Sequence, residues 1–150
     1  MVNPRLIRCI EANWREIAAA TVGRIREDSY VTHMARLSDY ELREWVHSVL
    51  NLLTSWPRTN LTEVIAERFQ EFGRGGFERS IPVQEAVRCL HTLKHILFDF
   101  TRRQGFAQNA IEIYAQEELE HDVGFLFDHM VFAAVLGYEE ARSHAGRQVR

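Results

Sequence analysis

Apolar side chains recur at steps of three and four in VQEAVRCLHTLKHILFDF, residues 83–100. This spacing places them on one face of a helix, which we expect to run from Pro82 to about Arg103. Pro82 suits the first turn of a helix, because the N–H that it lacks would have no helical partner there. The apolar residues of this face are Val83, Ala86, Val87, Leu90, Leu93, Leu97 and Phe100.

A second long helix is predicted from Asn109 to about Leu136-Gly137. Asn109 is a favourable N-cap, and Glu112 three residues later completes a capping box. About five residues join the two helices, so we expect them to form an antiparallel hairpin. The core face of the second helix carries Ile111, Ala115, Leu119, Val123, Leu126, Met130 and Ala133.

Three further helices are expected before this hairpin, over about 4–26, 38–56 and 60–72. The middle helix begins with a capping box at 38–41 (SDYE) and ends before Pro57. The third is expected to stop at four residues rich in glycine, 73–76 (GRGG).

No segment alternates with period two, so no strand is predicted. The sequence therefore predicts one all-α domain over residues 1–150, a bundle of five helices. Its core is expected at about 4–136 with Trp14, Trp45 and Trp56 inside it, and 137–150 is expected to be a polar, frayed tail.

Composition excludes several classes of function. The chain has 150 residues, of which 46% are hydrophobic and 26% charged, as in a globular protein with one core. A net charge of −3 gives no attraction to nucleic acid or to an anionic membrane. There is no signal-peptide core and no apolar run of about 18 residues, so we expect a cytoplasmic protein that spans no membrane. Cys9 and Cys89 are expected to be reduced thiols inside helices.

The helix at 109–136 is apolar on more than one side. Besides its core face it carries Tyr114, Phe125, Phe132 and Leu136, with Phe127 on a third line. A helix apolar around so much of its circumference is either central in the fold or buried in a partner. We expect a homodimer formed through the hairpin, with an interface that contains Tyr114, Phe125, Phe132 and Leu136. The alternative is a central helix in a monomer.

Histidines supply the one candidate metal site. His91 and His95 share a helix face, and Glu118 with His121 forms an E-x-x-H motif, half of a carboxylate-bridged di-iron signature. His129 is the most natural additional ligand. A di-iron bundle needs two such motifs and two further glutamates, and only one motif is present. Solvated or half-buried histidines are the alternative interpretation, and we expect no metal and no cofactor.

No motif of a catalytic site is present. The glycines at 73–76 follow no strand and lack the spacing of a phosphate-binding loop. The sequence contains no G-x-S-x-G, H-E-x-x-H or C-x-x-C, and its glutamates stand in first helical turns or on polar faces. We therefore expect no enzyme.

Several stretches carry a family resemblance. They are 10–14 (IEANW), 35–43 (ARLSDYELR) and 81–88 (IPVQEAVR), followed by Leu93-Lys94. In this order they resemble the N-terminal domain of the RsbR/RsbD-type RsbT co-antagonists of bacterial stress signalling.

The resemblance implies an all-helical, globin-like sensory domain without haem and without catalytic activity. Such a domain usually stands upstream of an output domain that signals to a downstream partner. No output domain is recognisable in this sequence. No histidine lies between Asn60 and Pro82, where a globin-like haem ligand would be expected, so we expect no haem. An interaction adaptor without a ligand is a further reading.

Overall fold

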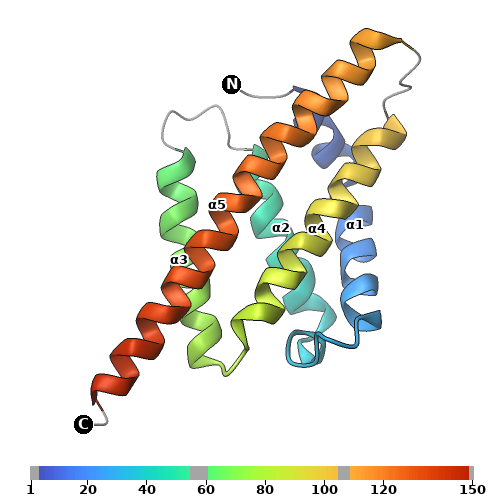
Figure 1. Ribbon diagram of the computed structural model, residues 1–150. Helices are drawn as coiled ribbons and strands as arrows, with labels where there is room; N and C mark the ends of the chain where they lie inside the picture. The colour runs from blue at the N-terminus through green and yellow to red at the C-terminus, as the bar shows by residue number, and fades with distance from the viewer. Residues whose placement is uncertain (1–3, 55–60, 105–108, 149–150) are drawn as a thin grey trace.

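The computed structural model describes residues 4–54, 61–104 and 109–148, and within these ranges every regular element is a helix and there is no strand. Figure 1 shows the helices in their order along the chain. The elements are α1 (Pro4–Glu27), the short 3₁₀ helix η1 (Met34–Arg36), α2 (Asp39–Thr54), α3 (Leu61–Glu78), α4 (Val83–Gln104) and α5 (Ala110–Gln148). The predicted all-α helical bundle is confirmed.

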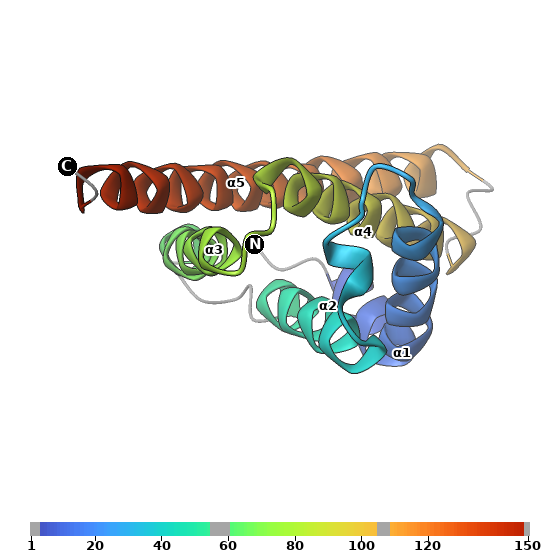
Figure 2. The same ribbon diagram turned by 90° about the horizontal axis from the view of Figure 1, so that it is seen from below.

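The helices form two layers. α4 and α5 lie side by side and antiparallel, while α1, α2 and α3 all lie on the same side of that pair (Figures 1 and 2). Polar contacts tie the pair together near its connection. Arg102 Nε donates to Glu120 at 2.6 Å, and Gln116 Nε2 donates to Thr101 Oγ1 at 3.0 Å. The first half of α5 packs on α4 through these contacts, and its second half packs on α3, where the rings of Phe77 and Tyr138 meet edge to face.

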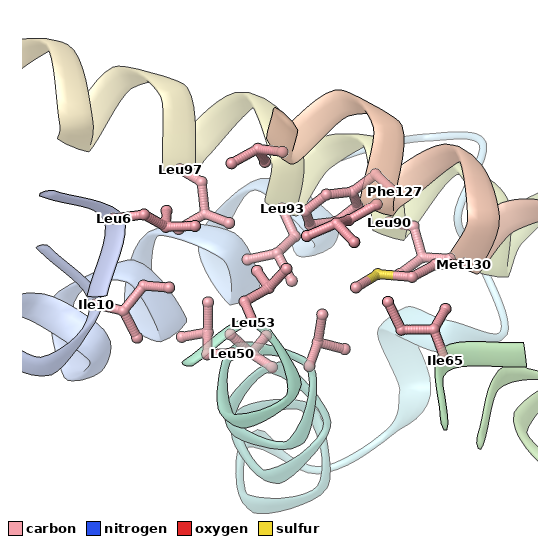
Figure 3. Close-up of a cluster of buried hydrophobic side chains, with 14 of the residues drawn as sticks. Leu6, Ile10, Leu50, Leu53, Ile65, Leu90, Leu93, Leu97, Phe127 and Met130 are labelled. Atoms are coloured by element: carbon pink, nitrogen blue, oxygen red, sulfur yellow. The ribbon is translucent and has the colours of Figure 1, made fainter. Parts of the chain in front are cut away.

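The core fills the space between the two layers. Figure 3 shows side chains from α1, α2, α3, α4 and α5 converging there. Phe127, which the sequence placed on a third line of its helix, is 1% exposed and belongs to this core. The side chains labelled in the figure are Leu6, Ile10, Leu50, Leu53, Ile65, Leu90, Leu93, Leu97, Phe127 and Met130.

Local capping signals define the helix starts. The Glu41 N–H donates to Ser38 Oγ at 3.1 Å, and the Ser38 N–H donates to the Glu41 carboxylate at 3.4 Å, so the predicted capping box forms. The Glu112 N–H donates to Asn109 Oδ1 at 3.0 Å, which confirms the N-cap of α5.

Two of the predicted core tryptophans can be placed. Trp14 and Trp45 are half-buried and pack against the core. Trp56 and Pro57, with the expected end of the second helix, lie outside the described residues.

Two predicted helix ends are wrong, and glycines explain both. α3 continues through the 73–76 segment to Glu78, and α5 continues past Gly137 to Gln148, so 137–148 is not a frayed tail. A Cβ on Gly73 would collide with the Ala134 carbonyl oxygen. A Cβ on Gly137 would collide with the backbone of Gln70. The two glycines therefore let α3 and α5 cross with their backbones in contact.

The predicted core face of α5 is correct except at its start. Leu119, Val123, Leu126 and Met130 are buried. Ile111 is 80% exposed, because it precedes the stretch of α5 that α4 and α3 cover. Among the described residues, no helix is both long and apolar enough to cross a membrane.

Candidate functional site on the outer face of the last helix

Five of the seven large hydrophobic side chains that are exposed among the described residues belong to α5. Tyr114, Phe125 and Phe132 are 72%, 53% and 69% exposed. Isolated exposed apolar residues are common, whereas apolar side chains gathered on one face are typical of an interaction site. The helical period places these three rings roughly opposite the buried face of α5, which carries Leu119, Val123 and Met130.

A regular row links these rings. At 100° per residue, one line along the helix passes through Tyr114, Glu118, His121, Phe125, His129, Phe132 and Leu136. We call these seven residues the α5 stripe. Leu136 and His129 are half-buried and the other five are exposed. The His129 ring packs edge-on against Phe125, with centroids 4.5 Å apart. All four residues expected in a dimer interface therefore share one face.

The candidate metal ligands are not brought together within the chain. Glu118 and His121 are exposed members of the α5 stripe. His91 and His95 lie on α4, where His95 borders an open groove beside Arg24 of α1. Across the described ranges, no three His, Cys, Asp or Glu side chains gather closely enough to hold a metal ion. The four residues His91, His95, Glu118 and His121 thus do not form one site in a single copy.

His91 sits at the junction between α4 and α5. Burial lowers its pKa below the ordinary value of 6.5, and the charges of Lys94 and His95 lower it further, while Asp128 on α5 acts in the opposite direction. The ring is half-buried, so it has an environment distinct from that of the exposed His95.

A buried carboxylate that sequence reasoning did not single out organises the other end of the bundle. Glu85 of α4 is only 3% exposed. Its Oε1 accepts hydrogen bonds from the His33 N–H at 2.7 Å and the Met34 N–H at 3.2 Å. Its Oε2 lies 2.6 Å from His33 Nδ1. Glu85 therefore satisfies the N-terminal N–H groups of η1 and compensates its own burial.

Arginines hold the rest of this loop. Arg26 donates to the carbonyl oxygens of Ala35 and Leu37, at 2.5 and 3.0 Å, and to Asp39 at 2.5 Å. Arg88 pairs with Asp28, which lowers the pKa of that carboxyl. These contacts hold the connection between α1 and α2 in place, which is a structural role.

Cys9 and Cys89 are buried and form no disulfide, as expected for reduced thiols inside helices. Burial raises the pKa of Cys9, and it raises the pKa of Cys89 to about 12. Thiols with raised pKa values are poor nucleophiles at neutral pH.

Comparison with known proteins adds no relative. No family model, curated protein or solved structure matches this chain.

Proposed function

We propose that this protein is a non-catalytic signal-input domain that acts as a homodimer, similar in role to the N-terminal domains of RsbT co-antagonists. The α5 stripe is the observation that carries the proposal. It presents aromatic rings on a face that no other described element covers. A ligand, a partner or a stress state would act by changing how the helices pack across the dimer.

The size of the stripe fits the centre of an interface. At their exposures, the three rings present roughly 400 Å² of aromatic surface. One partner of a standard interface buries about 800 Å². The rings would therefore supply about half of the surface that one partner buries, and neighbouring residues of α5 would supply the rest.

The arrangement of side chains also favours regulation over catalysis. Glu85 is the one carboxylate among the described side chains that is fully buried, and its oxygens are occupied by His33 and Met34. Catalytic acids and bases are instead expected in a pocket with access to substrate. Relay through packing needs two arrangements of a helical interface, which small shifts can select.

Sedimentation velocity of the full chain tests the dimer. We expect the wild-type protein to sediment as a dimer at micromolar concentration. The Phe125→Ser/Phe132→Ser variant should sediment as a monomer, with an unchanged helical circular dichroism spectrum.

Tyr40→Ser is the matched control, since Tyr40 is 73% exposed on α2, away from the stripe. It should leave the dimer intact. The concentration series should extend to about 100 μM. A wild-type protein that is still monomeric at that concentration would refute the proposal.

A further inference from the structure

The α5 stripe contains ligand-type side chains as well as aromatic ones. Glu118 and His121 are three residues apart and both exposed, so they can approach one ion from the same face. His129 stands on the same line two turns further on. At 1.5 Å per residue, His121 and His129 are separated by about 12 Å along the helix. One zinc ion, bound at about 2 Å from each nitrogen, cannot reach both within one copy.

The stripe is symmetric in its spacing about Phe125. Tyr114, Glu118 and His121 precede Phe125 by the same numbers of residues as Leu136, Phe132 and His129 follow it. A two-fold axis at Phe125 would relate two antiparallel α5 helices, and each contact would then occur twice. In that arrangement position 121 of one copy lies level with position 129 of the other.

Charge makes a bare pairing of two α5 helices unfavourable. Between Ala110 and Ala141 the sequence contains eight acidic residues and no lysine or arginine, and of these acids Glu120 pairs with Arg102 and Glu139 with Arg142 of the same chain. Two copies placed side by side therefore bring like charges together, which costs free energy. A divalent cation in the interface would offset this repulsion.

We propose that zinc-class divalent cations bind between two antiparallel copies of α5, each held by Glu118 and His121 of one copy and His129 of the other. Two imidazoles and a carboxylate are a common protein ligand set for zinc, with a fourth position left for water. The inference rests on the homodimer proposed above and deepens it, since the cation would set the strength of the dimer. Two equivalent sites would form in each dimer.

Zinc titration of the full chain by calorimetry is the first test. We expect one zinc ion per chain, and we expect His121→Ala and His129→Ala each to abolish that binding. His144→Ala is the control, since His144 is exposed on α5 but off the stripe, and it should bind zinc as the wild type does. Zinc should also tighten the dimer about tenfold or more in sedimentation experiments, with the effect reversed by a chelator.

Mixing the two inactive variants tests the two-chain geometry. In a mixed dimer, one site has lost both histidines and the other retains His121 from one chain and His129 from the second. Free exchange of chains should therefore restore about one quarter of the wild-type zinc capacity. A site within a single chain, or one between parallel helices, would restore none and would overturn the inference.

The remaining outcomes separate this inference from the proposed function. A dimer that forms equally well with zinc and with chelator, and that binds no zinc, overturns the metal site and leaves the dimer standing. A monomer under both conditions overturns both.

Discussion

At the scale of single residues, Glu85 shows how one side chain can hold a connection in place. Replacing it with alanine would leave the buried Met34 N–H and the His33 N–H without their acceptor. We expect Glu85→Ala to lower the free energy of unfolding by about 2–3 kcal/mol. Glu85→Gln keeps one carbonyl acceptor, so it should lower the free energy of unfolding by less than Glu85→Ala does. Urea denaturation measures both.

The matched control is Glu67→Ala, because Glu67 is an exposed residue of a helix interior. Its unfolding free energy should stay within about 0.5 kcal/mol of the wild type. Equal effects of Glu85→Ala and Glu67→Ala would contradict the anchoring role of the buried carboxylate.

His91 makes stability depend on pH. Its pKa in the folded chain is lowered from 6.5 by burial first and then by Lys94 and His95. The unfolded chain therefore binds this proton at a higher pH than the folded chain does. Its stability contribution is complete above pH 6.5 and declines as the pH falls toward the folded pKa.

We therefore expect the wild type to lose more stability than His91→Gln between pH 7 and pH 5. Denaturation curves at a series of pH values give the difference. His144→Gln is the comparison and should keep the wild-type pH dependence, because that ring is exposed and is not among the groups that act on His91. Identical pH dependence in wild type and His91→Gln would argue against the assignment.

The role of Glu85 could not be predicted from its local sequence. A glutamate in the first turn of a helix is ordinary, because it interacts favourably with the helix dipole. Its partner His33 lies 52 residues away in the chain. Only the packing of α4 beside η1 brings the two together.

At the scale of elements, the crossing of α3 and α5 depends on two glycines. Gly137→Ala would place a methyl group against the Gln70 backbone, and Gly73→Ala would place one against Ala134. Neither backbone can rotate away as a side chain could. We expect each variant to lose about 2–4 kcal/mol of stability, although alanine favours the helix itself by about 1 kcal/mol. Thermal and urea denaturation measure the loss.

Gly124→Ala and Gly75→Ala are matched controls on the same two helices. A Cβ at either position has no neighbour within 4 Å. These variants should be stabilised by up to about 1 kcal/mol. The interpretation of the crossing fails if Gly137→Ala behaves like Gly124→Ala.

Helix starts were predictable and two helix ends were not, for a physical reason. A start is specified by residues close in sequence, such as Ser38 with Glu41 or Asn109 with its neighbour Glu112. A glycine late in a helical pattern can end the helix, or it can allow the backbone of another helix to approach closely. Gly73 and Gly137 take the second role, and only the partner helix distinguishes the two.

At the scale of the whole molecule, the proposed dimer couples stability to concentration. Because association favours the folded state, dilution should lower the melting temperature. We expect a 100-fold rise in protein concentration to raise the melting temperature by about 3–5 °C. Scanning calorimetry or circular dichroism can follow this change.

The variants used for sedimentation provide the comparison. The Phe125→Ser/Phe132→Ser variant should melt at one temperature whatever the concentration, whereas Tyr40→Ser should keep the wild-type dependence. A wild-type melting temperature that does not move with concentration would be inconsistent with a dimer.

The outer row of α5 could be predicted because helical periodicity alone assigns residues to faces. The sequence assigned three aromatic residues to a second apolar side of the helix, outside its core face. All three are exposed in the structure: Tyr114, Phe125 and Phe132. The same periodicity wrongly assigned Ile111 to the core, because periodicity carries no information on how far α4 extends along α5. Periodicity likewise cannot tell that His95 borders a groove beside α1 while His121 lies on the outer face of α5.

α5 has 39 residues and is therefore about 58 Å long. From Phe125 to Gln148 the helix spans about 35 Å, and its backbone is braced against α3 along much of that distance. A tilt of about 5° at Phe125 would displace the far end by roughly 3 Å. Because α3 is held against this half of α5 by backbone contact, the two helices would swing together as one body, and a change at the proposed dimer interface would reach both of them.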